Sequence, residues 1–156
     1  MNRNQSHDRR SKAASDSGNS APRSSLLVVD DEQRIADTLA LILASKGYAC
    51  RAAYDGDSAL ALCREQAPDL VISDVVMPRL NGIELALRIF REFPACRVLL
   101  FSGQAATADL LEEARACGHE FDLLAKPVHP EELLATIARM LGGAAPRLAA
   151  VRPISR

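Results

Sequence analysis

Five side chains with reactive or metal-binding groups follow short apolar runs of this sequence. They are three carboxylates, a hydroxyl and an ammonium group: Asp30, Asp31, Asp74, Ser102 and Lys126. Open α/β sheets bind their ligands at the carboxyl ends of parallel strands, where such residues come together. Three converging carboxylates repel one another and raise at least one pKa unless a cation lies among them. Because hard oxygen ligands favour Mg²⁺ or Mn²⁺, the sequence predicts a divalent metal site.

A carboxylate beside a bound metal can also act as a nucleophile and accept a phosphoryl group as an acyl phosphate. Phosphoryl transfer needs mainly positioning and neutralisation of charge, which Lys126 and Ser102 can supply to two phosphoryl oxygens. Each residue alone has an ordinary interpretation, since aspartates cap helices and open turns, and serine and lysine are common in loops. Their joint occurrence in this order favours the phosphoryl site.

The apolar runs predict the strands that would position these groups. Continuous apolar runs of four or five residues are typical of strands covered on both faces, as in a parallel sheet. The runs lie at 26–29, 70–73, 98–101 and 123–125, and the segment 48–54 predicts a further short strand.

Helical patterns alternate with these strands. Ile35, Leu39, Ile42 and Leu43 recur at helical spacing and are expected to form the buried face of the first helix. Four more helices are expected around residues 59–63, 83–90, 104–117 and 130–141. Five strands alternating with five helices predict an α/β fold with a doubly wound five-stranded parallel sheet, in the flavodoxin-like order 2-1-3-4-5.

Local signals mark several helix boundaries. Asp55 and Asn81 can accept hydrogen bonds from free amides at helix starts, Glu84 supports Asn81, and Pro130 opens the last helix. Glycines at 47 and 118 are expected to end helices.

Composition divides the chain into three parts: a basic leader at 1–24 expected to be disordered, a domain at 25–142, and a flexible C-terminal tail at 143–156. The two end segments together carry 8 basic and 2 acidic residues, against 11 basic and 18 acidic residues in the domain. The basic charges of the leader are dilute, so we expect a solvated segment and no nucleic-acid binding.

Other sequence features bear on where in the cell the protein is expected. The leader lacks the apolar stretch of a signal peptide, and no run approaches the length of a membrane helix, so no membrane contact is expected. The four cysteines are widely spaced and form no C-x-x-C pair, and their apolar neighbours favour buried thiols in a reducing compartment, the cytoplasm, over a zinc site.

Four segments resemble the motifs of receiver domains from two-component response regulators, the CheY-like domains. They are Val28–Glu32, Ser73–Pro78, Phe101–Gly103 and Ala125–Pro127, and they occur in the family's order within residues 25–142. Each motif alone is weakly specific, but the four together are highly specific.

The resemblance implies a role for each site residue. Asp74 would be the phosphoacceptor, and Lys126 would pair with it before phosphorylation and with the phosphoryl group afterwards. Asp31, Asp74 and the backbone carbonyl of Val76 would bind Mg²⁺ directly, whereas Asp30 would act through water.

Further implications concern the switch. Ser102 would turn inward to the phosphoryl group, and the bond between Lys126 and Pro127 would be cis. One position departs from the family pattern, because Leu123 stands where an aromatic residue is usual, with Phe121 two residues earlier. We therefore expect the conformational signal to pass mainly through the loop at 102–107.

The expected function is that of a single-domain response regulator. It would receive its phosphoryl group from a sensor histidine kinase or phosphotransfer protein and signal through protein contacts. It would not be an enzyme, since it modifies only itself. A homodimer could form through helices four and five, where Leu111 and Leu133 fall outside the main apolar faces.

Other functions fit less well. A haloacid-dehalogenase-type hydrolase would need a second aspartate at position 76, which is valine, and a nucleotide-binding protein would need a glycine-rich turn after the first strand. The remaining alternative is a receiver-like interaction scaffold that works without phosphorylation.

Overall fold

A five-stranded parallel sheet forms the centre of the molecule. The computed structural model describes residues 23–103 and 106–142. Its strands are β1 (Ser25–Val29), β2 (Ala49–Ala53), β3 (Leu70–Asp74), β4 (Arg97–Ser102) and β5 (Asp122–Ala125). They pair in the order β2-β1-β3-β4-β5, and all four neighbouring pairs are parallel. The predicted fold class and strand order are confirmed.

One helix follows each strand. The helices are α1 (Gln33–Ser45), α2 (Gly56–Glu65), α3 (Gly82–Glu92), α4 (Ala106–Ala116) and α5 (Pro130–Met140). The predicted leader, apart from residues 23 and 24, and the predicted tail at 143–156 lie outside the described residues. Among the described helices, none combines the length and the apolar character that crossing a membrane requires.

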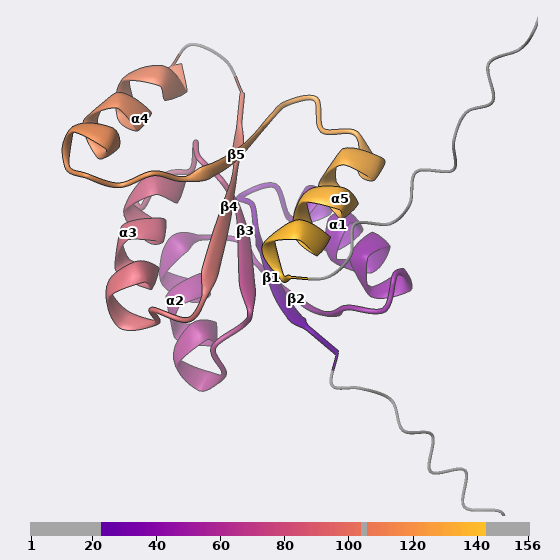
Figure 1. Cartoon of the computed structure of the whole chain (residues 1–156). Helices are drawn as coiled ribbons and strands as arrows, with labels where there is room; N and C mark the ends of the chain where they lie inside the picture. Colours follow the sequence, from indigo (N-terminus) through magenta and orange to yellow (C-terminus); the bar gives the residue numbers. More distant parts are fainter. Residues whose placement is uncertain (1–22, 104–105, 143–156) are drawn as a thin grey trace, which may run out of the picture.

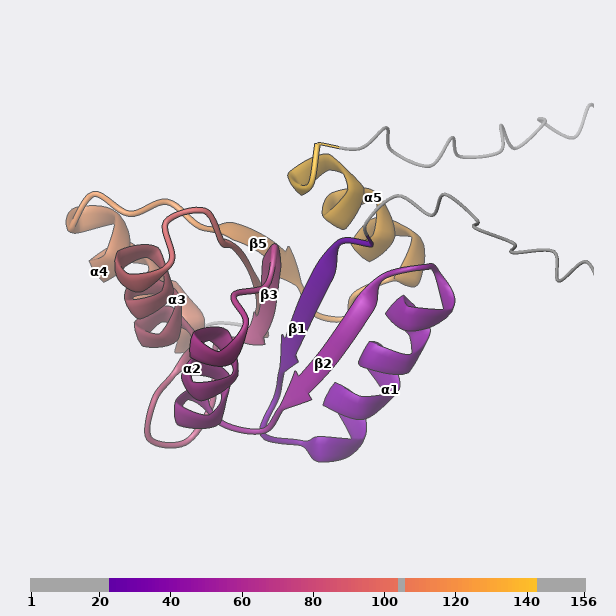
Figure 2. The same ribbon diagram turned by 90° about the horizontal axis from the view of Figure 1, so that it is seen from below.

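The helices cover both faces of the sheet and make a three-layered molecule. Helices α1 and α5 lie on one face, and α2, α3 and α4 lie on the other (Figures 1 and 2). Side chains of β1 alternate between the layers: Leu26 and Val28 pack toward α1 and α5, and Leu27 and Val29 pack toward α2 and α3. This burial on both sides explains why the strands read as uninterrupted apolar runs.

The buried face of α1 differs from the predicted one. Leu43 is fully buried as expected, but Ala36 is the other buried residue of the helix. Ile35 and Ile42 are 43% and 38% exposed, and Leu39 is only partly buried. The apolar residues of α1 occupy a wider part of the helix surface than the part that packs on the sheet. Periodicity therefore located the helix correctly, but it assigned some exposed residues to the core.

A second correction concerns α5. Leu133, expected outside the apolar face, is 3% exposed and packs in the core beside Ile137 and Met140. Leu111 of α4 is partly buried against the opposite layer. Leu133 is therefore not available as a contact for a second copy of the chain.

The helix boundaries follow the predicted signals. Asp55 accepts a hydrogen bond from the Ser58 amide at the start of α2. Asn81 and Glu84 form a reciprocal capping box at the start of α3, and Pro130 begins α5. These caps fix where each helix starts, and hence the loops that follow the carboxyl ends of the strands.

Gly82, the first residue of α3, lies against the end of β3. Its amide donates to the carbonyl of Val75 at 2.8 Å. A Cβ atom at position 82 would collide with the backbone carbonyl oxygen of Asp74. The absence of a side chain therefore lets α3 begin directly beside the strand end that carries Asp74.

We predict that Gly82→Ala destabilises the domain by about 1–3 kcal/mol, because the methyl group must push the Asp74 backbone or the start of α3 aside. Thermal and urea unfolding would measure the loss. Gly103→Ala is the matched control, since a Cβ there would meet Lys126 at an ordinary 3.6 Å. Equal stability of the Gly82→Ala variant and the wild type would contradict this account of the close approach.

Candidate functional site

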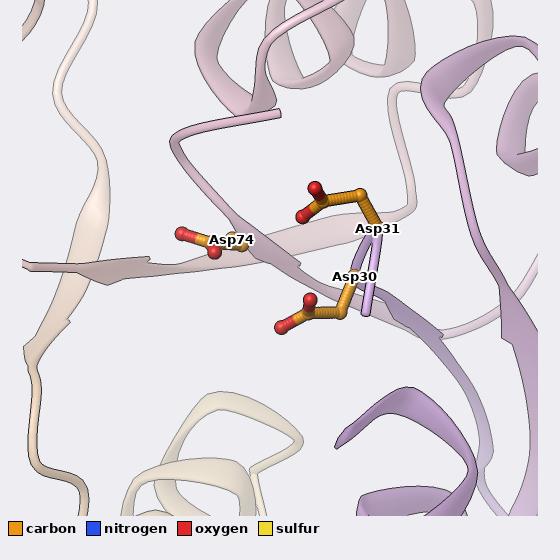
Figure 3. A group of neighbouring side chains, drawn as sticks. All are labelled: Asp30, Asp31 and Asp74. Carbon is orange, nitrogen blue, oxygen red and sulfur yellow. The ribbon is translucent and has the colours of Figure 1, made fainter. Parts of the chain in front are cut away.

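Three carboxylates meet at the carboxyl edge of the sheet. Asp30 and Asp31 directly follow β1, and Asp74 is the last residue of β3, the strand beside it. One carboxylate oxygen from each residue lies within 4.8 Å of the others. Figure 3 shows the three side chains projecting into the same space from these two neighbouring chain segments. The predicted convergence is confirmed for these three residues.

Both oxygens of Asp74 are engaged. Its Oδ2 accepts a hydrogen bond from Lys126 Nζ at 2.9 Å, and its Oδ1 accepts one from the Val76 amide at 3.2 Å. The Asp74 side chain is 12% exposed and the Lys126 side chain is 37% exposed. Asp74 is thus held firmly at the sheet edge, beside a cation that can still reach solvent.

Asp30 is the most buried acid of the cluster, at 4% exposed. Its Oδ1 accepts from the Glu32 amide at 2.9 Å, so the carboxylate also orients the start of α1. Burial raises the pKa of Asp30, although that hydrogen bond opposes the rise, and the nearby charge of Asp74 raises the pKa further. Ionising Asp30 in this position therefore costs desolvation free energy and adds repulsion from Asp74.

Ser102 and Lys126 are brought to the same edge by the pairing of β4 with β5. Ser102 lies opposite Ala125 in the register, and the Lys126 amide donates to the Ser102 carbonyl at 2.9 Å. The bond between Lys126 and Pro127 is cis, as the resemblance implied. Ser102 is half-buried at the end of β4. All five predicted positions therefore lie at the carboxyl ends of strands.

The cluster suits a hard divalent cation. Its donors are carboxylate oxygens, the ligands that Mg²⁺ and Mn²⁺ prefer, and their mutual repulsion would be relieved by a cation among them. Burial raises the pKa of Asp30, and the neighbouring charge of Asp74 adds to that rise. Val76, the remaining predicted ligand, follows Asp74 in the loop and has a 56% exposed side chain.

Two features of the site were missed by the sequence interpretation. Gly82 permits α3 to pack on the Asp74 backbone, and the Val75 amide donates to the Phe101 carbonyl at 3.1 Å, which extends the link between β3 and β4 past Asp74. The Asn81-Gly82 pair was a usable signal for the first. The second depends on strand register, which the sequence alone did not specify.

Near Leu123, the position where the family usually has an aromatic residue, two aromatic side chains stack on a phenylalanine of α3. Leu123 lies opposite Leu100 and is partly buried in the layer of α2, α3 and α4. Phe121 stacks on Phe90 of α3, with ring centroids 5.7 Å apart and planes inclined by 14°, and His119 stacks on Phe90 as well. The ring of Phe121, the aromatic residue two positions before Leu123, is thus packed against α3.

Residues 26–138 match the family model of the response regulator receiver domain. The chain belongs to this family. The probable transcriptional regulatory protein TcrX of Mycobacterium tuberculosis is 33% identical over 116 residues, covering 74% of this chain and 49% of TcrX. The transcriptional regulatory protein CreB of Escherichia coli is 34% identical over 122 residues, covering 76% of this chain and 51% of CreB. This chain therefore spans about half the length of these relatives.

Solved receiver structures agree with the fold. Chemotaxis protein CheY4 of Vibrio cholerae has a TM-score of 0.67 and 30% identity, over 76% of this chain and 99% of CheY4. A response regulator receiver domain protein from Clostridium thermocellum has a TM-score of 0.69 and 27% identity, over 76% of this chain and 94% of that chain. The receiver domain of this chain thus has the architecture of proteins in two-component signalling.

The raised pKa of Asp30 predicts how this receiver domain responds to pH and metal. The folded state holds the Asp30 proton more tightly than the unfolded chain, so stability falls as the pH rises from the ordinary value of 3.8 through the raised pKa. We expect Asp30→Asn to raise the melting temperature of the metal-free protein at neutral pH, and the difference to vanish below about pH 3, where both side chains are neutral.

Calorimetry with and without Mg²⁺ would check this expectation. Mg²⁺ should stabilise the wild type more than Asp30→Asn, because the variant has lost one of the repelling charges. Asp109→Asn, an exposed change on α4, is the control and should respond to Mg²⁺ as the wild type does. A lower melting temperature for metal-free Asp30→Asn at neutral pH would contradict the proposed cost of ionising Asp30.

Proposed function

We propose that this receiver domain accepts a phosphoryl group on Asp74 from the phosphohistidine of a sensor histidine kinase or phosphotransfer protein. The observation that carries the proposal is the environment of Asp74: a nearly buried carboxylate in contact with Lys126 and beside two further acids. A lone structural ion pair would not need Asp30 and Asp31 at the same place, because their charges weaken it.

The transfer forms one bond and breaks one. A carboxylate oxygen of Asp74 attacks phosphorus, the bond from phosphorus to the histidine nitrogen breaks, and the imidazole leaves with the electron pair. The product is an acyl phosphate on Asp74. Lys126 Nζ, already 2.9 Å from Oδ2, follows the charge onto a phosphoryl oxygen, and the Ser102 hydroxyl donates to another.

Asp31, Asp74 and the Val76 carbonyl are the proposed direct ligands of Mg²⁺, with Asp30 acting through water. When bound, Mg²⁺ or Mn²⁺ supplies positive charge that offsets the carboxylates and the incoming phosphoryl group. The protein contributes the rigid placement of the ligands at the ends of β1 and β3.

The resting state returns by hydrolysis of the acyl phosphate. The domain then assists its own phosphorylation and dephosphorylation and acts on no other substrate, so it is proposed not to be an enzyme in the usual sense. Val76, at 56% exposed, offers the attacking water no polar group. Gln104, the other residue expected beside that water, lies outside the described residues.

The output of the domain is proposed to pass through protein contacts in the cytoplasm. The face of α4, β5 and α5 is the proposed surface for a target or a second copy, without Leu133, which is buried. The four free cysteines support a reducing setting. Cys63 and Cys96 are buried as expected, and burial raises the pKa of Cys96 to about 12, whereas Cys50 is only partly buried and Cys117 is exposed.

Phosphorylation itself is directly testable. Acetyl phosphate with Mg²⁺ should add one phosphoryl group to the protein, stable in acid and labile in base, as measured by intact mass. Asp74→Ala should abolish the gain, and the surface control Asp109→Ala should retain it, because Asp109 is exposed on α4 and is not one of the three clustered acids. A folded wild-type protein that gains no mass from acetyl phosphate or a kinase panel would favour the phosphorylation-independent scaffold.

The path of the conformational signal is testable with a phosphoryl mimic. We expect beryllofluoride with Mg²⁺ to slow amide hydrogen exchange in α4, because the inward turn of Ser102 would draw the following loop toward the site. Ser102→Ala should remove most of this change. Ser45→Ala is the control, since its hydroxyl bonds the Ile42 carbonyl on α1. Unchanged exchange in α4 on binding of the mimic would contradict the proposed route.

A further inference from the structure

A groove of about 500 Å³ runs between α1 and α5, on the face of the sheet that these two helices cover. Figures 1 and 2 both place the helices beside each other on this face. The walls of the groove are mainly apolar: Ile35, Leu39 and Ile42 come from α1, and Val128, Pro130 and Leu134 come from α5 and the loop before it.

The groove exposes apolar groups that the core does not use. Ile35 and Ile42 are 43% and 38% exposed, and both belong to the group of large exposed hydrophobic residues of the described chain. Scattered exposed apolar side chains are ordinary, but a continuous apolar groove of this size marks a binding surface. Covering it would remove apolar area from water, which stabilises the covered state.

A segment of the same chain begins beside one end of this groove. Helix α5 ends at Met140, and Gly142 has a φ of +74°, a left-handed conformation that turns the chain away from the helix axis. Helix α5 has 11 residues and is about 16 Å long, whereas the 14 residues at 143–156 can span up to about 46 Å. The segment is therefore long enough to return along the whole of α5.

The composition of residues 143–156 matches the groove. Leu148, Val151 and Ile154 are spaced three residues apart, which places them on one side of any conformation with about three residues per turn. The segment also carries Arg147, Arg152 and Arg156 and no acidic residue, whereas residues 25–142 hold 18 acidic and 11 basic residues. Apolar pattern and net charge both favour the domain as its partner.

We propose that residues 147–154 of the C-terminal segment dock in the groove between α1 and α5 of the same molecule. They enter at the end near Ile42 and run antiparallel to α5, with Leu148 and Val151 against Ile42 and Leu134. Arg34 and Lys126 line the opposite end, next to Asp30, and their charges oppose an arginine there. The contacts nearest Ile42 therefore hold the segment. Docking of this segment involves no step of the phosphoryl chemistry.

The test uses the full chain with isotope-labelled isoleucine and leucine methyl groups, observed by NMR. Leu148→Asp with Val151→Asp should release the segment and shift the methyl signals of Ile35, Ile42 and Leu134. The matched control, Ala144→Asp with Ala145→Asp, adds the same charge to the same segment outside the docking residues and should leave those signals in place.

Peptide binding to variants inside and outside the groove tests whether the groove itself is the docking site. A peptide of residues 143–156, added to the Leu148→Asp, Val151→Asp protein, should restore the wild-type methyl signals. Adding Ile42→Asp to that protein should weaken peptide binding by roughly tenfold or more, since a charge replaces an apolar contact. Leu41→Asp should change it less than about twofold, because Leu41 is 71% exposed and borders a different depression on α1.

Three results would overturn the proposal. The released and wild-type proteins could give identical methyl spectra, which means that nothing leaves the groove. The shifts could fall on α4 and β5, which places the segment on another face. On dilution, the methyl signals of the groove in the wild type could shift to their positions in the released protein, which means that a second copy of the chain supplies the occupant.

Discussion

Electrostatic repulsion at one edge of the sheet governs this receiver domain. Asp30, Asp31 and Asp74 bring carboxylate oxygens within 4.8 Å of one another, and Lys126 is the one basic side chain that forms an ion pair with them among the described residues. Such a cluster is costly in a protein interior, so the surrounding fold must hold it in place. The same excess of negative charge attracts cations to the site. The carboxylate cluster that destabilises the fold is therefore also the group that suits the site to bind a metal ion.

The stability that offsets this cost lies in the two apolar layers. The central strands β1, β3 and β4 have both faces buried, and their register carries Asp30, Asp74 and Ser102 to a common edge. Backbone contacts then fix the edge locally, through the Val76 amide on Asp74 and the close approach of Gly82. The site is therefore rigid because it continues the sheet, and the loops add only the last few contacts.

Much of this arrangement was predictable because it depends on patterns of neighbouring residues that can be recognised in the sequence itself. Apolar runs gave the strands, and the residues after them gave the acid cluster and Lys126. The buried side of α1 was not predictable, since Ile35 and Ala36 are both apolar and only the packed sheet decides between them. The approach of Gly82 to Asp74 likewise depends on the relative placement of a helix and a strand. Roles that need a bound ion or a phosphoryl group remain proposals.

Helix α1 buries Ala36 and Leu43 and leaves several of its large apolar residues outward. Ala36 meets the sheet, while Ile35, Leu41 and Ile42 remain accessible. Substitutions at the outer positions disturb few buried atoms, so they change the surface of the helix at little expense in folding free energy, typically within about 0.5 kcal/mol. The residues of α1 that hold the fold and those that reach its surface are thus different. A gene duplicate of this chain could acquire new binding preferences there while its architecture stays intact.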